Sequence, residues 1–531
     1  MDDVTDEQEP GGLLLRDVRL VGAPDPRRVR DVLLAGGRVA AVADPGVLTA
    51  DHVVDAGGAA LLPGLRDEHV HLSDWAAHRH RPDVAAAADP REAASLLAVA
   101  DAARGRRDEV LVGRGFRDGL WPEPPRAEHL DEALPGRPVV VASADLHSAW
   151  CSTAAARRFG VPQAGLLTER AAMALLADAG RLPEALGDVW VLEAAQAAAT
   201  LGVTGVVDLQ KASPLEWARR ADVTRPEPTA GGAWVAGGPS VAGGRGPALR
   251  VAVGVWREHL DDVLAPGLRT GDPLPGVVDD VAGERVRLGP LKLFVDGSLG
   301  TRTAFCRSAY GGGHGGDDHG VLLTPAEELE ELLRRATSAG LTTAVHAIGD
   351  EGVRVALDGY EAAGCGGRVE HAQQVRPEDL PRFAALGVTA SVQPRHVVDD
   401  RDLADRFWAG ATSHAFPYAA LLAAGADLVL GSDAPVAPLD PWDAIACAVH
   451  RSDDDRPPWH PEQHLTLRQA LTASCGGRSH VRVGDVADLT LLAEDPADTL
   501  AVGGPDALRA PEVLGTLVGG RWTHRRSALA P

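Results

Sequence analysis

The sequence predicts an α/β protein built on a TIM (β/α)8 barrel. Short apolar runs bounded by turn residues alternate with alanine-rich helical stretches, which is the pattern of successive βα units and a parallel sheet. Eight such runs can be counted between residues 61 and 435, and eight parallel strands are what a closed barrel of this kind needs. The chain has 531 residues, so it is long enough for further structural units beside the barrel.

The eight predicted strands follow one another along the chain. They cover residues 61–72, 203–210, 249–256, 286–297, 341–350, 368–373, 388–394 and 427–435. Barrels of this kind carry their catalytic groups at the C-terminal ends of the strands. The polar side chains that end these runs are therefore the first candidates for a functional site.

Two parts of the chain depart from this repeat. Residues 1–60 and 477–531 alternate apolar and polar residues like antiparallel strands, which predicts one composite β-sandwich domain built from both chain ends. The barrel would then occupy residues 61–476. The gap between residues 72 and 203 is too long for a simple crossover, so we expect an inserted subdomain over residues 72–200.

Composition narrows the class of partner. The formal net charge is -23, and this charge repels nucleic acids and anionic membranes. A small-molecule substrate is the partner class that fits this charge better. A homodimer is one of the assemblies that the composition allows. Five scattered cysteines, an acidic start and no apolar run of 18 residues favour a reduced, cytoplasmic protein without a signal peptide or membrane span.

Two histidine pairs could hold a metal ion. His69 and His71 end the first barrel strand, where alternate residues point to the same side and can share one metal. His78 and His80 form a second pair in "AAHRHRPD", a stretch typical of a solvated helix end. The strand context favours the first pair as ligands.

Further candidate ligands end three later strands. A lone strand histidine is more often a hydrogen-bonded core or surface residue. Here, however, one barrel would bring all of these strand ends to the same opening. Together with the first pair, the candidate metal ligands are His69, His71, His346, His371 and Asp433.

Lys292 is an unusual choice for this sequence. Of 52 Lys and Arg residues, only Lys211 and Lys292 are lysine, which leaves 50 arginines. Lys292 lies in the apolar fourth strand, where burial favours the neutral amine. A neutral amine can add carbon dioxide and form a carbamate that bridges two metals, whereas guanidinium stays protonated. The alternative is a lysine that reaches the barrel rim or binds a substrate anion.

The ordered motifs resemble a known family. "PGLRDEHVHL", "LKLFVDGSLGTRTA", "HAIGD", "VEHAQ", "SVQPRH", "GSDAPV" and "ADLTLLAEDP" are together similar to the amidohydrolase superfamily, within it the YtcJ-like group that includes N-substituted formamide deformylases. Glu68 stands where that family usually has a small residue. The resemblance extends from about residue 12 to residue 526 and implies a TIM barrel, a composite β-sandwich and a metal centre.

The resemblance also implies roles for individual residues. His69, His71 and Asp433 would hold one metal, His346 and His371 a second, and carboxylated Lys292 would bridge them. The metals would be two Zn²⁺ ions, with Fe²⁺, Mn²⁺ or Co²⁺ as alternatives. Candidate substrate contacts are His147, Trp150, His396 and Arg302.

The resulting hypothesis is hydrolysis of an amide C–N bond, including that of an N-substituted formamide, by metal-activated hydroxide. Lys292 and Asp433 are the predicted catalytic residues, and Asp433 would move the proton from the attacking water to the departing amine. His147 or His396 would stabilise the oxyanion. Three alternatives stay open: a mononuclear deaminase with unmodified Lys292, an ester, lactone or carbamate hydrolase, and a non-catalytic scaffold.

Overall fold

The computed structural model describes residues 12–104, 110–118, 121–144, 148–224, 245–277, 285–310 and 318–529. The chain forms two compact units, one from the residues up to Leu72 together with those from Leu192 onward, and a second from Ser73–Val191. No helix in these described ranges is long and apolar enough to cross a membrane.

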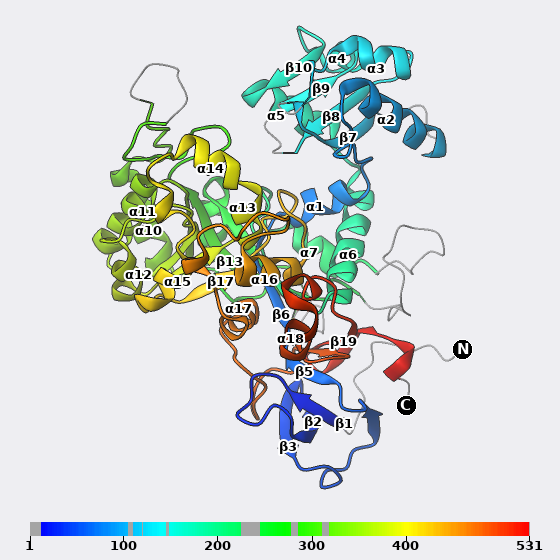
Figure 1. Cartoon of the computed structure of the whole chain (residues 1–531), viewed down its shortest axis with the longest axis vertical. Helices are drawn as coiled ribbons and strands as arrows, with labels where there is room; N and C mark the ends of the chain where they lie inside the picture. The colour runs from blue at the N-terminus through cyan, green and yellow to red at the C-terminus, as the bar shows by residue number, and fades with distance from the viewer. Residues whose placement is uncertain are drawn as a thin grey trace. The chain divides into compact units, whose positions relative to one another are not determined.

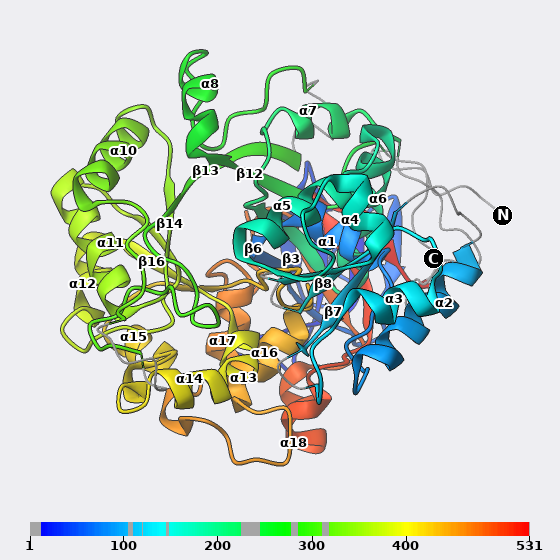
Figure 2. The same ribbon diagram turned by 90° about the horizontal axis from the view of Figure 1, so that it is seen from above.

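An eight-stranded parallel sheet curls into the nearly closed barrel of the first unit (Figures 1 and 2). The chain order is the spatial order, and a parallel bridge links Val70 of the first strand to Ala434, which follows the last strand. The predicted barrel is confirmed. Its strands are β6 (Leu65–Val70), β11 (Val203–Asp208), β12 (Arg250–Trp256), β13 (Val286–Phe294), β14 (Thr343–Ala347), β15 (Gly367–His371), β16 (Val388–Val392) and β17 (Leu428–Leu430).

The first predicted strand is in fact two. Residues Ala60–Pro63 form β5 of a different sheet, and β6 begins at Leu65. Between them, a Cβ on Gly64 would lie 2.2 Å from Cγ2 of Thr204, so only glycine allows this close approach. The apolar run is continuous because both strands are buried, and hydrophobicity alone does not mark the division.

Amphipathic helices cover the outside of the barrel. In α10 (Ala326–Ser338) the buried residues Leu329, Leu332, Leu333 and Ala336 recur at helical spacing. Figure 2 shows α10, α11 (Asp350–Ala363) and α12 (Leu380–Leu386) outside β14 and β16. The other helices of eight residues or more from residue 184 onward are α6 (Glu184–Thr200), α16 (Pro441–His450), α17 (Leu467–Ser474) and α18 (Pro496–Ala507). The shorter ones are α7 (Glu216–Ala221), α8 (Leu260–Leu264), α13 (Pro394–Asp399), α14 (Arg401–Phe407) and α15 (Tyr418–Ala423).

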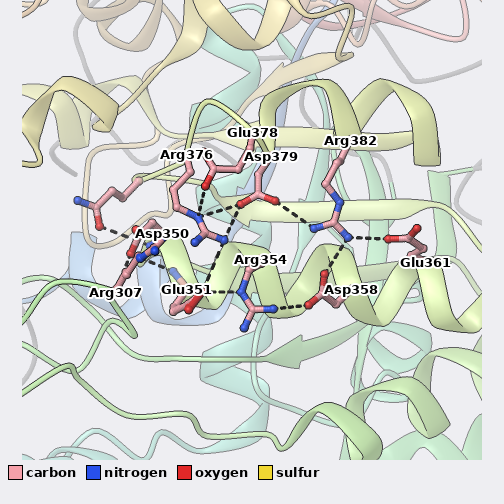
Figure 3. A network of polar contacts seen from close by, with 11 residues as sticks. Arg307, Asp350, Glu351, Arg354, Asp358, Glu361, Arg376, Glu378, Asp379 and Arg382 are labelled. Carbon is pink, nitrogen blue, oxygen red and sulfur yellow. Dashed lines mark hydrogen bonds and ion pairs between the residues drawn. The ribbon is translucent and has the colours of Figure 1, made fainter.

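Ion pairs tie α11, α12 and the loop after β15 together (Figure 3). Arg354, Arg376 and Arg382 each contact two or more carboxylates, and Asp379 is shared between Arg376 and Arg382. Most of these side chains are partly exposed, so each pair adds little alone, but the shared network fixes the spacing of the two helices.

Both chain ends contribute to a second eight-stranded sheet. Its order is β20-β19-β18-β5-β1-β2-β3, with β4 paired to β1, and β18 runs antiparallel to β5. Figure 1 shows the blue N-terminal and red C-terminal strands of this part. The sequence boundaries at residues 60 and 477 stay predictions. The strands are β1 (Leu13–Leu20), β2 (Val29–Ala35), β3 (Arg38–Ala43), β4 (His52–Asp55), β5, β18 (Leu489–Leu492), β19 (Val513–Val518) and β20 (Arg521–Arg525).

The inserted unit has its own sheet and core. Its four strands are in the order β10-β9-β8-β7, of which only β7 and β8 pair in parallel. The strands are β7 (Leu111–Phe116), β8 (Val139–Ser143), β9 (Ser148–Cys151) and β10 (Gly165–Thr168). The helices are α1 (Leu72–Arg79), α2 (Pro90–Arg104), α3 (Ala127–Ala133), α4 (Thr153–Phe159) and α5 (Glu169–Ala179).

Candidate metal centre

Three buried side chains meet at the C-terminal ends of the barrel strands. His69 of β6, His371 of β15 and Asp433 after β17 each offer one ligand atom, and these atoms lie within 4.8 Å of one another. The backbone of His371 has φ 76° and that of Asp433 φ 59°. Non-glycine residues rarely adopt this left-handed conformation, and it is found where a site requires a particular side-chain direction.

The other predicted ligands surround this group. His71 Nε2 lies 3.2 Å from Asp433 Oδ1, and the rings of His346 and His371 have centroids 4.4 Å apart. His346 Nε2 lies 3.1 Å from the carbonyl oxygen of Gly297. A carbonyl only accepts, so Nε2 is the donor and Nδ1 keeps its lone pair.

The buried imidazoles are neutral. Burial, followed by the charge of Lys292, lowers the pKa of His69 to about 4 and that of His346 to about 3. Burial and His346 lower the pKa of His371 well below its usual value. Although burial opposes the charged form of Asp433, the imidazoles of His69 and His71 hold its pKa well below the usual range. Neutral imidazoles and an ionised carboxylate are the forms that bind divalent metals.

Lys292 lies among these groups as the sequence suggested. Its side chain is 1% exposed, and within the described residues its Nζ has no hydrogen-bond partner. Burial lowers the pKa of Lys292 to about 8, against the attraction of Glu370 and Asp433. The ammonium therefore loses its proton more readily than an exposed lysine, as carbamate formation requires.

The donor atoms fit a divalent cation. His69 Nδ1 lies 2.7 Å from Glu370 Oε2, so it donates to that carboxylate and its Nε2 presents a lone pair. This Nε2 faces Asp433 Oδ1 at 3.4 Å. Both atoms can donate an electron pair to one divalent cation, and histidine with carboxylate suits zinc and its neighbours.

His396 faces the same carboxylate. It lies in α13 with Nε2 4.0 Å from Asp433 Oδ2, and its ring is parallel to that of His371 at 6.2 Å. Within the described residues this buried Nε2 has no hydrogen-bond partner. A substrate atom beside this pair would be within hydrogen-bond reach of both side chains.

The remaining predicted contacts have different surroundings. Trp150 is fully buried in the core of the inserted unit, where its indole N–H donates to the carbonyl of Arg126. Trp150 therefore packs as a core residue, as is common for a tryptophan within an apolar strand. Arg302 lies over the ring of Phe407 at 5.8 Å. His147 lies outside the described residues.

Sequence reasoning missed two carboxylates near the ligands. Glu370 directly precedes His371 and is fully buried. Asp296, after β13, accepts from the backbone N–H groups of Phe305, Ile348 and Gly349, and burial raises the pKa of this carboxyl to about 7. For Glu370, a charged residue inside a barrel strand was the available signal, because such residues are buried only when paired.

Known proteins share this sequence pattern and fold. The sequence model of the Amidohydrolase family matches residues 52–524. Over 516 residues the chain is 28% identical to Protein LONG AFTER FAR-RED 3 of Arabidopsis thaliana (87% of this chain, 82% of that protein). It is also 26% identical to the putative amidohydrolase YtcJ of Bacillus subtilis strain 168 (88% and 90%).

Two further comparisons concern a shorter region and the fold. The chain is 28% identical to the N-substituted formamide deformylase of Arthrobacter pascens over 263 residues, which is 46% of each chain. The crystal structure of an uncharacterized metal-dependent hydrolase from Pyrococcus horikoshii OT3 superimposes with a TM-score of 0.72 at 23% identity, covering 91% of this chain and 98% of that one.

Proposed function

Because this chain belongs to the amidohydrolase family, in its YtcJ-like group, it is a hydrolase, and we propose that it hydrolyses an amide C–N bond of a small molecule with the help of a divalent metal. N-substituted formamides are the first substrate class to test, since a deformylase of that name is among its relatives. The observation that carries the proposal is the convergence of His69, His371 and Asp433 at the barrel mouth.

Five side chains and a modified lysine would form the centre. His69, His71 and Asp433 would hold one Zn²⁺, His346 and His371 a second, and Lys292, once carboxylated, would bridge the two. Bound there, divalent zinc supplies a Lewis acid that favours deprotonation of water and polarises a carbonyl. Fe²⁺, Mn²⁺ and Co²⁺ suit the same donors.

The chain's own groups move the protons. Asp433 is ionised and accepts a proton from the attacking water at Oδ2, then returns it to the nitrogen as the C–N bond breaks. His396 Nε2, which faces that oxygen across 4.0 Å, donates to the carbonyl oxygen as negative charge develops there. The products are a carboxylic acid, which is formic acid for a formamide, and an amine.

A one-metal centre is the second candidate. The described residues contain one group of three ligand atoms within 4.8 Å, and Lys292 would then stay a free amine. The same barrel could then deaminate a substrate, or act on an ester, lactone or carbamate, because only the leaving group differs.

The test combines metal analysis with a substrate screen. Metal content per chain is measured by mass spectrometry, and amine release is measured from N-formyl and N-acyl amines. Two metals per chain with amine release are expected. One metal per chain favours the second candidate, and a protein with neither metal nor turnover would contradict the enzymatic function.

A further inference from the structure

A chain of four charged side chains, two buried glutamates and two partly buried arginines, runs through the barrel toward His69. Arg66 Nε donates to Glu68 Oε1 at 2.5 Å, and Arg368 Nη1 donates to Glu68 Oε2 at 2.9 Å. Arg368 Nε in turn donates to Glu370 Oε1 at 2.9 Å. Two arginines and two glutamates alternate, so the chain carries no net charge, which lowers the cost of burying it.

This chain crosses the interior of the barrel. Arg368 and Glu370 belong to β15, Arg66 and Glu68 to β6, and the strand order places β16 and β17 between them on one side. Contacts between these strands must therefore span the lumen. Arg368 Nη2 also donates to the backbone carbonyl of Glu68 and, at 2.9 Å, to Ser391 Oγ, so its guanidinium is held from three sides.

The last contact reaches a predicted metal ligand. Glu370 has one oxygen on Arg368 and the other 2.7 Å from His69 Nδ1. With both oxygens engaged, the carboxylate has a fixed orientation. A carboxylate paired with guanidinium only accepts, so the proton of the neutral imidazole must lie on Nδ1.

We propose that Glu370 is the positioning residue of His69: it selects the tautomer with a free Nε2 and aims that nitrogen at the metal, while Arg368 and Glu68 hold Glu370 in place. The inference rests on the metal centre of the proposed function, and it adds a residue that touches neither metal nor substrate. Outer partners of this kind typically change metal affinity about 10- to 100-fold.

The test measures Zn²⁺ affinity of the full chain by competition with a chelator. Glu370→Gln keeps the size of the side chain but puts an amide where His69 needs a carboxylate acceptor. We expect Zn²⁺ to dissociate about 10- to 100-fold more readily. The matched control is Asp101→Asn, which removes the carboxylate from another part-buried pair, with Arg137 at 2.9 Å. It should lower thermal stability and leave Zn²⁺ affinity unchanged.

A charge-balanced variant separates affinity from folding. Glu370→Gln leaves one arginine in excess, so Arg368→Gln with Glu370→Gln restores neutrality, and it too should bind Zn²⁺ more weakly. A folded double variant that binds Zn²⁺ as tightly as wild type would overturn the inference. If neither variant folds, nitrogen chemical shifts of His69 in the metal-free wild type decide: a proton on Nδ1 supports the inference and a proton on Nε2 overturns it. Wild type that binds no Zn²⁺ would instead contradict the proposed function.

Discussion

The proposed role of Asp433 in proton transfer can be tested by a single substitution. Replacing it by Asn keeps the shape and one oxygen but removes the group that accepts and returns the proton. We expect Asp433→Asn to lower kcat by about 10²- to 10⁴-fold, with metal still bound through the histidines. Turnover assays and metal analysis on the same sample check this. Unchanged turnover with full metal content would rule out the proton-transfer role.

The two lysines of the chain provide a matched pair of variants. Lys292 is buried, whereas the side chain of Lys211 is 67% exposed beside Glu258. In protein prepared with ¹³C-bicarbonate, we expect a carbamate carbon signal that Lys292→Arg abolishes, because guanidinium does not react with carbon dioxide. Lys292→Arg should also lose the second metal.

Lys211→Arg is the control, and it should keep the carbamate signal, the metals and the activity. A wild-type protein with two metals and no carbamate would contradict the bridging role of Lys292. If Lys211→Arg lost the carbamate signal to the same extent as Lys292→Arg, the labelled carbon could not be assigned to Lys292.

At the scale of elements, the loop between β14 and α11 fixes the position of His346. A Cβ on Gly349 would lie 2.2 Å from the carbonyl oxygen of Phe305, and backbone atoms there cannot move aside without shifting the loop. We expect Gly349→Ala to destabilise the fold by about 1–3 kcal/mol and to reduce metal content, since His346 lies three residues earlier. Denaturant unfolding and metal analysis measure both effects.

Gly300 offers the control for this substitution. It is exposed, and a Cβ there would meet nothing within 4 Å. Gly300→Ala should therefore leave stability and metal content within error of wild type. If Gly349→Ala does the same, the close packing of the loop does not determine the position of His346.

At the scale of the whole molecule, the candidate ligands join parts of the barrel that are far apart in sequence. They come from β6 at one end of the sheet and from the segment after β17 at the other, where Asp433 N donates to the carbonyl of His69. A metal held by both would stabilise the closure of the barrel, because a ligand that binds only the folded state adds to its stability.

Removal of the metal should therefore weaken the fold. At a free Zn²⁺ concentration 100 times Kd, binding stabilises the native state by about 2.7 kcal/mol, so we expect a chelator to lower Tm by a few degrees and added Zn²⁺ to restore it. Calorimetry with and without chelator measures the change. A Tm that does not respond, in protein whose metal has been removed, would contradict a stabilising role for the ion.

Much of the site could be read from the sequence because barrel geometry is regular. Each of the eight predicted runs overlaps a barrel strand, and His69, His71, His346, His371 and Asp433 converge where strand ends should meet. One expectation had to change with tertiary contacts in view, because the first run contains two strands from different sheets. The role of Trp150 as a substrate contact stays a prediction.

The sequence by itself determined which residues end the barrel strands and which of them have the chemistry of metal ligands, because alternation and strand order are local properties of the chain. Only the tertiary structure decided which side chains meet across the lumen. Glu68 and Arg368 are 300 residues apart, as the contact between them records, and no local pattern specifies that pairing. Burial of opposite charges requires a partner, but the closed barrel determines which partner it is.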